Sequence, residues 1–390
     1  MLKTDKFAAL DGLRGLCACL VALHHFEAKG PITDSVFIRQ SWIFVDFFFV
    51  LSGFIIAYKY FQNLNTRGDL FSFAVRRFAR LYPLHIFVLL LMIGLEFINL
   101  HFSSHSAGSF FTERHSIFAI FTNLLMVQTL HLHPKLTWNG PSWSISAEWW
   151  TYLLFALMCY SLNLKTRWMA FMTLALLGVL IFLFALDTGL NVHVNYGFLR
   201  CVLGFSVGVL CYCCRTWLVS NKPELSTNTG LASSLEVLIG VAVIGFCLLP
   251  LDGRISVAAP FLFALAVIVF SYENGPLSRF LKTKPLQFLG MLSFSIYMVH
   301  WLVQSVIYHL VSLSAKRLKI NLWDGATNQL GESTLLVGRT ALEGSIAHVL
   351  ALGLVILLSY FTYHYVERPG RTLAQRYLSS RAASISSALP

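Results

Sequence analysis

The stretch LDGLRGLCACLVALHHF, residues 10–26, is the first strongly apolar run of the chain, and it contains Arg14 and His25. Arg14 and His25 are eleven residues apart. That separation is about three helical turns, so both side chains return to nearly the same helix face, roughly 16 Å apart along the axis. Ionisable groups cost about 2.5–3.5 kcal/mol each at the centre of a bilayer. A pair of them on one stripe of an apolar helix therefore predicts a functional site.

The composition of the chain is that of a polytopic membrane protein. Of its 390 residues, 56% are hydrophobic and 12% are charged, and the mean hydropathy is +0.67. Soluble globular domains carry about 25% charged residues, so that class of protein is excluded. We predict an all-α membrane bundle of about ten transmembrane helices, because that many segments can cross about 30 Å of hydrocarbon. The segments lie near residues 8–27, 42–60, 84–101, 147–163, 168–187, 194–214, 233–250, 256–272, 287–310 and 346–365.

The predicted spans follow one another almost without interruption, which indicates a single transmembrane domain over residues 1–373. Residues 374–390 are rich in Ser and Ala, so we expect a flexible cytoplasmic tail. A further apolar stretch, 116–130, carries Asn123 and Gln128. We expect this stretch to re-enter the membrane or to lie at its surface.

Lys and Arg residues are unevenly distributed between the two sides of the membrane. With the N-terminus inside, the inner segments hold 18 of them and the outer segments hold 9. This bias predicts a multi-pass protein of the inner (cytoplasmic) membrane with both termini in the cytoplasm. Contact of the inner loops with anionic lipid head groups accounts for the net charge of +11 without a nucleic-acid partner.

Neither a disulfide framework nor a metal site is expected. All eight cysteines lie in apolar segments or at their ends. The cluster Cys211, Cys213 and Cys214 is typical of small packing residues, with metal binding or lipidation as the alternative. The outer histidines His131 and His133 have no outer Cys or carboxylate cluster to complete a metal site.

His25 is the first candidate for catalysis. A neutral imidazole, with an ordinary pKa of about 6.5, is the side chain best suited to take a proton from an alcohol near neutral pH. Asp11 lies one turn before Arg14 and is expected to pair with it. A histidine hydrogen-bonded at the outer interface is the structural alternative, and the shared face of Arg14 and His25 favours function.

Two further segments carry candidate residues. Asp46 and Gly53 share a face of the second span, with Ser52 beside them. A functional acid and a helix-capping Asp are both open for Asp46, and the glycine allows another helix or a ligand to approach closely. In the basic inner segment, Arg77 and Arg80 share a face if the segment is helical. Guanidinium groups match phosphate geometry, and a positive-inside anchor is the alternative.

The fourth, sixth and ninth spans carry polar residues that an apolar helix does not require. Glu148 enters the apolar run of the fourth span and is expected to fix or charge-pair an imidazole. Ser293, Tyr297 and His300 recur at i, i+4 and i+7, which predicts one polar stripe facing the bundle. That stripe suits either substrate contact or helix–helix hydrogen bonding. Arg200 is an isolated cation whose partner the sequence leaves open.

Six motifs, in order along nearly the whole chain, resemble those of acyltransferase family 3, which contains bacterial O-acetylases of surface polysaccharides. They are LDGLRG with its following His (10–25), VDFFFVLSGF (45–54), RRFARLYP (76–83), PSWSISAEWW (141–150), FLGMLSFSIYMVH (288–300) and VERP (366–369). Each motif alone is weak, but the ordered set is specific. One departure is Phe44, where the family commonly has Gly, and we expect little consequence from it.

The resemblance implies a membrane O-acyltransferase, an enzyme that transfers groups other than aminoacyl groups. Its donor substrate is acetyl-CoA or another acyl-CoA, and its acceptor is a hydroxyl of an extracytoplasmic glycan or lipid-linked saccharide. In this layout arginines hold the CoA phosphates, His25 is the base, and Tyr297 or Ser52 donates to the oxyanion. The residues expected to carry catalysis are His25, Arg14, Glu148 and Asp46, and those expected to contact acyl-CoA are Arg14, Arg77, Arg80, Ser52, Tyr297 and His300.

Two other classes of protein remain as alternatives. A multi-span transporter or flippase of a lipid-linked or acidic solute would use its arginines for binding and His25 as a proton relay. The absence of an internal repeat weakens that reading, because many transporters are built from repeats. A purely structural membrane subunit explains the apolar bulk of the chain but leaves the in-phase Arg14 and His25 without a role.

Overall fold

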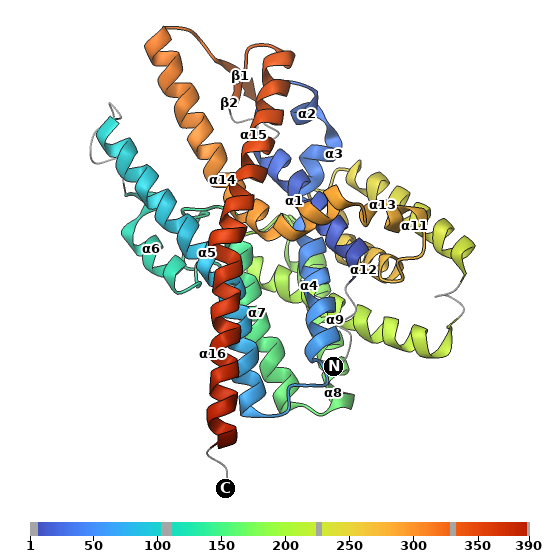
Figure 1. The fold of residues 1–390 in the computed structure, drawn as a ribbon. Coiled ribbons are helices and arrows are strands. Elements are labelled where there is room, and N and C mark those ends of the chain that lie inside the picture. Colours follow the sequence, from blue (N-terminus) through green and yellow to red (C-terminus); the bar gives the residue numbers. More distant parts are fainter. Residues whose placement is uncertain (1–6, 103–110, 224–227, 328–332, 388–390) are drawn as a thin grey trace. The chain divides into compact units, whose positions relative to one another are not determined.

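The computed structural model describes residues 7–102, 111–223, 228–327 and 333–387, and these residues are predominantly helical (Figure 1). The predicted all-α class is confirmed. The ten predicted spans coincide with α1 Ala8–His25, α4 Phe44–Tyr60, α5 Arg67–Phe102, α7 Ser142–Ser161, α8 Leu164–Leu180, α9 Gly197–Asn221, α11 Thr229–Cys247, α12 Ala259–Phe270, α14 Lys284–Leu318 and α15 Ala341–Thr362. The shorter or more polar helices are α2 Pro31–Asp34, α3 Val36–Arg39, α6 Ile117–Leu124, α13 Pro276–Leu281 and α16 Arg368–Ser387.

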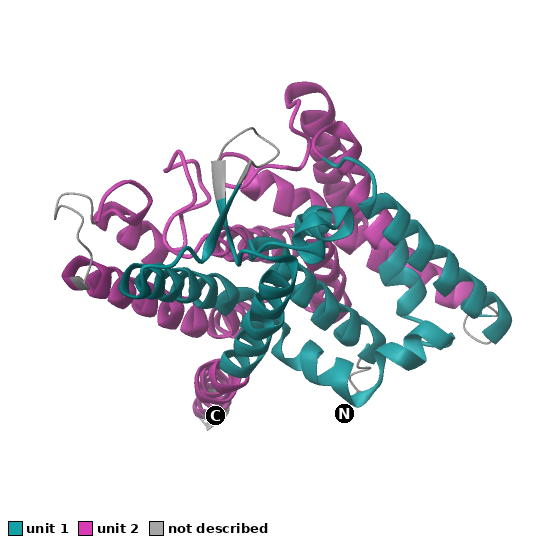
Figure 2. Ribbon diagram, turned by 90° about the horizontal axis from the view of Figure 1, so that it is seen from above, with its two compact units in different colours: residues 1–45, 222–251, 265–359 teal, residues 46–221, 252–264, 360–390 magenta. Residues whose placement is uncertain are grey.

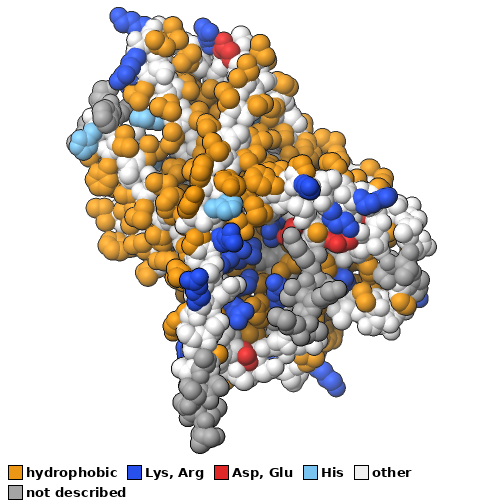
Figure 3. Space-filling model, viewed as in Figure 1, with side chains coloured by type: hydrophobic (Ala, Val, Ile, Leu, Met, Phe, Trp, Pro, Cys, Tyr) orange, Lys and Arg blue, Asp and Glu red, His pale blue; other side chains and the backbone are white. Residues whose placement is uncertain are grey.

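Seven helical stretches of the described residues are long and apolar enough to cross a membrane. They are Val36–Tyr60, Arg67–His101, Leu164–Ala185, Gly197–Asn221, Thr229–Cys247, Lys284–Leu318 and Ala341–Ala382. Of the other predicted spans, α1 and α7 carry polar side chains that lower their hydropathy, and α12 has only 12 residues. Many large apolar side chains are exposed, and Figure 3 shows them covering much of one face. The chain is a multi-pass membrane protein.

The helices belong to two compact units, each built from three separate stretches of sequence (Figure 2). Unit 1 comprises Met1–Val45, Lys222–Leu251 and Leu265–Ser359, and unit 2 comprises Asp46–Asn221, Asp252–Ala264 and Tyr360–Pro390. The single domain expected over residues 1–373 therefore contains two interleaved units, and no single cut in the sequence separates them.

Unit 1 is organised around the packing of α1 against α14. Glycines make this close packing feasible: a Cβ atom at Gly15 would lie 2.5 Å from the backbone nitrogen of Gly290, and one at Gly290 would collide with the carbonyl oxygen of Asp11. Small residues allow membrane helices to approach closely, which increases their van der Waals contact. Gly15 and Gly290 therefore explain why α1 lies directly against α14.

A β-hairpin in unit 1 follows α14, in a region where the sequence analysis identified no secondary structure. Strands β1 Trp323–Thr327 and β2 Ser333–Val337 are antiparallel, with Trp323 opposite Val337. The backbone nitrogen of Lys29 donates to Val337 O at 3.0 Å, and Val337 N donates to Glu27 O at 3.2 Å. The hairpin thus holds the residues that immediately follow α1.

Unit 2 contains a second close helix contact, between α4 and α9. A Cβ atom at Gly53 would collide with the carbonyl oxygen of Phe205, and one at Gly208 would collide with that of Val50. The prediction that Gly53 admits another helix is confirmed. In this contact the residues of α4 from Asp46 onward lie directly against the backbone of α9.

The structure adds detail to the expectations for three segments of unit 2. Helix α5 runs without a break through Pro83, so the basic inner segment is helical from Arg67. The stretch 116–130 contains only the eight-residue helix α6, which is too short to cross a bilayer that needs about 20 residues. The tail expected to be flexible continues as α16 to Ser387, because this helix packs on α5 and buries Leu378.

Candidate active site

Arg14 and His25 of α1 both contact α14, within unit 1. Arg14 Nε donates to Ser293 Oγ at 2.7 Å, and Arg14 Nη2 donates to the carbonyl oxygen of Gly290 at 2.9 Å. The predicted pairing with Asp11 is confirmed, with Arg14 Nη2 3.2 Å from Asp11 Oδ1. The guanidinium therefore fixes the first turns of α1 against α14.

His25 is held in one orientation by its own helix. Its Nδ1 atom lies 2.9 Å from the carbonyl oxygen of Val21. A carbonyl oxygen only accepts hydrogen bonds, so in the neutral ring Nδ1 carries the proton and Nε2 keeps a free lone pair. The ring centroid lies 5.0 Å from that of His300 and 5.5 Å from that of Trp301. The arrangement provides the tautomer that a general base needs.

The backbone beyond His25 is anchored by three other elements of unit 1. The amide of Glu27 donates to Tyr308 Oη at 2.7 Å, and His348 Nε2 lies 3.1 Å from the carbonyl oxygen of Phe26. The pairing of Lys29 with the hairpin completes this set. Because α14, α15 and the hairpin all contribute, the position of His25 depends on residues distant in the sequence.

The predicted polar stripe of α14 is buried along its length. Ser293 Oγ accepts a hydrogen bond from Arg14 Nε, and the ring centroid of Tyr297 lies 5.8 Å from that of His300. His300 is 2% exposed, and its Nδ1 lies 3.3 Å from the carbonyl oxygen of Ile296. His300 Nε2 has no hydrogen-bond partner among the residues that the structure describes.

A second polar cluster lies within unit 2, around the carboxylate of Glu148. Ser52 Oγ donates to Glu148 Oε1 at 2.6 Å, and Tyr152 Oη donates to the same oxygen at 2.5 Å. The two hydroxyls are 2.8 Å apart. An imidazole was expected beside Glu148, but the hydroxyls of Ser52 and Tyr152 bind it instead. Tyr152 could have been predicted, because it follows Glu148 at the i+4 position that shares its face.

Arg77 and Arg80 on α5 lie near this cluster. The Arg77 guanidinium carbon is 5.9 Å from the ring centroid of Tyr152 and 5.7 Å from that of Tyr60. Arg80 lies one turn further along α5, so its charge is also near the Tyr152 hydroxyl. In the part of the chain that the structure describes, neither arginine forms an ion pair, and Arg77 Nε is buried without a hydrogen-bond partner. Both are half-buried, whereas the adjacent Arg76 is exposed.

Asp46 and Arg200 form an ion pair within unit 2. Arg200 Nε donates to Asp46 Oδ1 at 3.0 Å and Nη2 donates to Oδ2 at 2.7 Å. Arg200 also donates to the carbonyl oxygen of Val192 and lies over the ring of Trp143. Both oxygens of the Asp46 carboxylate are engaged, which favours a positioning role for this residue over a role as an acid in the reaction.

Basic side chains gather on another part of unit 2. Figure 3 shows Lys and Arg side chains grouped along α16. In this helix Arg371 is paired with Glu367, and Arg381 stacks on Phe71 with its guanidinium carbon 4.2 Å from the ring centroid. These contacts hold α16 together and attach it to α5.

Comparison with known proteins yields one family. The family model for acyltransferase family 3, described as an acyltransferase domain, matches residues 7–364. Protein 2 in the picA locus of Rhizobium radiobacter is 32% identical over 155 residues, which are 37% of this chain and 78% of that protein. The acyltransferase MdmB of Streptomyces mycarofaciens is 30% identical over 161 residues, 39% of each chain. No solved structure matches the chain.

Proposed function

The chain belongs to acyltransferase family 3 and is a multi-pass membrane acyltransferase, and we propose that it moves an acetyl group from cytoplasmic acetyl-CoA to a hydroxyl of an extracytoplasmic glycan or lipid-linked sugar. The observation that supports this reaction best is the free lone pair on Nε2 of His25, fixed by the hydrogen bond from Nδ1 to Val21. The proposal places the enzyme in the cytoplasmic membrane with both termini inside.

In the proposed reaction, His25 Nε2 takes the proton of the acceptor hydroxyl as its oxygen attacks the thioester carbonyl carbon. The C–O bond forms, the C–S bond breaks, and the CoA thiolate receives the proton from the imidazolium, which restores neutral His25. General acid–base catalysis of this kind contributes about 10²–10⁴-fold to a rate. Tyr297 is the oxyanion donor of the proposal, because the hydroxyl proton of Ser52 is already donated to Glu148.

We propose that Arg77 and Arg80 bind the phosphates of acyl-CoA. Guanidinium groups bind phosphate oxygens through paired, charge-assisted hydrogen bonds. Half-buried arginines without an acidic partner among the described residues are suited to an anionic ligand, since an incoming phosphate supplies the missing countercharge. Glu148 holds the Ser52 and Tyr152 hydroxyls beside Arg77 and so defines the polar surroundings of that guanidinium.

We propose two roles for Arg14, one in binding the donor substrate and one in holding α1 against α14. It contacts the donor substrate, and it does so from the place in which Asp11, Gly290 and Ser293 hold its guanidinium. Because these contacts join α1 to α14, Arg14 also keeps His25 next to His300. The two assignments are separable by measuring donor affinity and stability in the same variants.

The experiment that tests the proposed function uses the full chain purified in detergent with radiolabelled acetyl-CoA. We expect release of CoA thiol and transfer of label to a glycan fraction from the cell envelope. Mass spectrometry of surface glycans from cells with and without the gene then identifies the acceptor and the mass of the acyl group. A transporter or flippase releases no thiol from acyl-CoA, and that result would overturn the proposal.

A further inference from the structure

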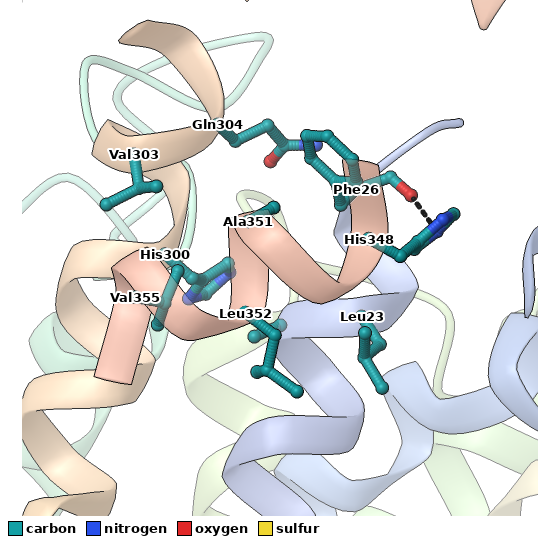
Figure 4. Close-up of a pocket in the computed structure, with 10 residues that line it drawn as sticks. Leu23, Phe26, His300, Val303, Gln304, His348, Ala351, Leu352 and Val355 are labelled. Carbon is teal, nitrogen blue, oxygen red and sulfur yellow. Dashed lines mark hydrogen bonds between the residues drawn. The ribbon is translucent and has the colours of Figure 1, made fainter. Parts of the chain in front are cut away.

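Three helices of unit 1 enclose a small apolar cavity next to His300 (Figure 4). Its volume is about 10 Å³, and it is lined by α1, α14 and α15. Its lining includes Leu23, His300, Val303, Ala351, Leu352 and Val355. A cavity of this size admits about one water-sized group.

The cavity lies next to His25, the base of the proposed reaction. His300 lines the cavity, and its ring centroid lies 5.0 Å from that of His25. A hydroxyl oxygen bound to His25 lies about 2.6–3.2 Å from Nε2, and the carbon it attacks is about 3–3.5 Å further on. The next carbon of the acyl group is about 1.5 Å beyond that. The methyl carbon of an acetyl group thus lies within about 8 Å of His25 Nε2, a reach that extends past the ring of His300 at the cavity wall.

We propose that this cavity receives the methyl end of the transferred acyl group and restricts the enzyme to acetyl. The inference rests on the proposed function and extends it by naming the residues that select the acyl chain. Val303, Ala351, Leu352 and Val355 provide the apolar wall. Gln304 and His348 also line the cavity, but both are already hydrogen-bonded within the protein, Gln304 to Tyr308 and His348 to the carbonyl oxygens of Gly344 and Phe26. A water molecule needs two to four polar partners, so an alkyl group is the better occupant.

His300 Nε2 lies at the cavity and has no hydrogen-bond partner among the described residues. Because His300 Nδ1 faces the carbonyl oxygen of Ile296, Nε2 is the hydrogen-bond acceptor of the neutral ring. A buried acceptor without a partner is unfavourable, so a donor group of a bound substrate stabilises it. The reacting hydroxyl gives its single proton to His25, so His300 Nε2 accepts a hydrogen bond from a second donor group of the bound acceptor, and the aliphatic residues face the methyl group.

The test compares acetyl-CoA, propionyl-CoA and butyryl-CoA as donors for cavity variants of the full chain. Leu352→Ala enlarges the cavity, and Ala351→Val fills it. The matched control is Leu354→Ala, which removes the same atoms from an exposed position of the same helix. One methylene in a pocket changes kcat/KM by about 10–200-fold. We expect Leu352→Ala to raise the ratio of butyryl to acetyl transfer at least tenfold, Ala351→Val to lower acetyl transfer, and the control to match the wild type.

The outcomes separate this inference from the proposed function. If the wild type transfers acetyl and folded Leu352→Ala keeps the wild-type ratio, the cavity does not select the acyl group and the inference is overturned. The ratio is measured within one protein sample, so a lower yield of either variant does not affect it. If the wild type releases no thiol from any of the three donors, the proposed function itself fails.

Discussion

Asp46 on α4 and Arg200 on α9 form a forked ion pair in which the side chains are 0% and 1% exposed. The pair joins the two helices that glycines already bring into close contact. From the sequence, Asp46 was a candidate for catalysis and Arg200 lacked a partner. The structure gives each residue its counterpart and indicates that the pair holds the second span in place.

Removing one charge of this pair is expected to destabilise the protein more than replacing both side chains with apolar ones. Asp46→Asn leaves the buried guanidinium without a countercharge and should lower the free energy of unfolding by about 3–5 kcal/mol. The double variant Asp46→Leu/Arg200→Met removes both charges, and apolar replacements of buried pairs are often neutral in stability. Thermal unfolding in detergent measures both effects, and thiol release from acetyl-CoA measures activity.

The double variant also decides between the two roles of Asp46. If Asp46 only positions α4, a folded double variant retains most of its thiol release. A double variant that unfolds at the wild-type temperature but releases no thiol would show that the carboxylate takes part in the reaction.

Substitution of Arg77 or Arg80 by Ala should weaken donor binding rather than the chemical step. Loss of charge-assisted hydrogen bonds worth about 1.5–3 kcal/mol raises the KM for acetyl-CoA about 10–100-fold, with a small change in kcat. Acetyl-pantetheine lacks the phosphates of CoA, so the same variants should leave its KM unchanged. Arg76→Ala is the control, since Arg76 is an exposed neighbour of Arg77. Equal effects on both donors would contradict phosphate binding by these residues.

Arg14 is expected to combine a structural role with a role in donor binding. Ser293→Ala removes the acceptor of Arg14 Nε and should cost about 0.5–3 kcal/mol of stability while leaving the KM for acetyl-CoA unchanged. Arg14→Ala removes the guanidinium itself and should impair both stability and donor affinity. Calorimetric titration with acetyl-CoA checks the second effect, and normal affinity in Arg14→Ala would limit this residue to holding α1 against α14.

Acidification should destabilise the loop that contains His133. Burial lowers the pKa of His133, whose Nε2 lies 2.7 Å from Thr122 Oγ1. The unfolded chain has an ordinary histidine pKa of about 6.5, so below that pH it takes up a proton that the folded protein resists. The contribution of His133 to stability is complete above that pH and is lost as the pH falls. The unfolding temperature of His133→Gln should therefore fall less between pH 7.5 and 5.5 than that of the wild type, and parallel falls would contradict this assignment.

The spacing of residues along the sequence predicted the features that depend on the geometry of a single helix. The pairing of Asp11 with Arg14, the common face of Arg14 and His25 and the packing role of Gly53 all follow from helical geometry within one span. The same periodicity placed Ser293 and His300 on the stripe of α14 that meets α1.

Contacts between distant segments could not be predicted in this way. Nothing in the local pattern identifies Asp46 as the partner of Arg200, because the two are 154 positions apart. The hairpin at 323–337 was missed because it is short and lies in a polar segment, and its role becomes visible only through its bonds to Glu27 and Lys29.

The most direct test of the account is the rate of thiol release from acetyl-CoA by His25→Ala, measured with the acceptor glycan in proteoliposomes. His25→Gln serves as a second variant that preserves bulk and polarity at the site. The account predicts a loss of at least about 100-fold in kcat for both, with an unchanged KM for acetyl-CoA and an unchanged unfolding temperature. Wild-type turnover in either folded variant would contradict the assignment of His25 as the base.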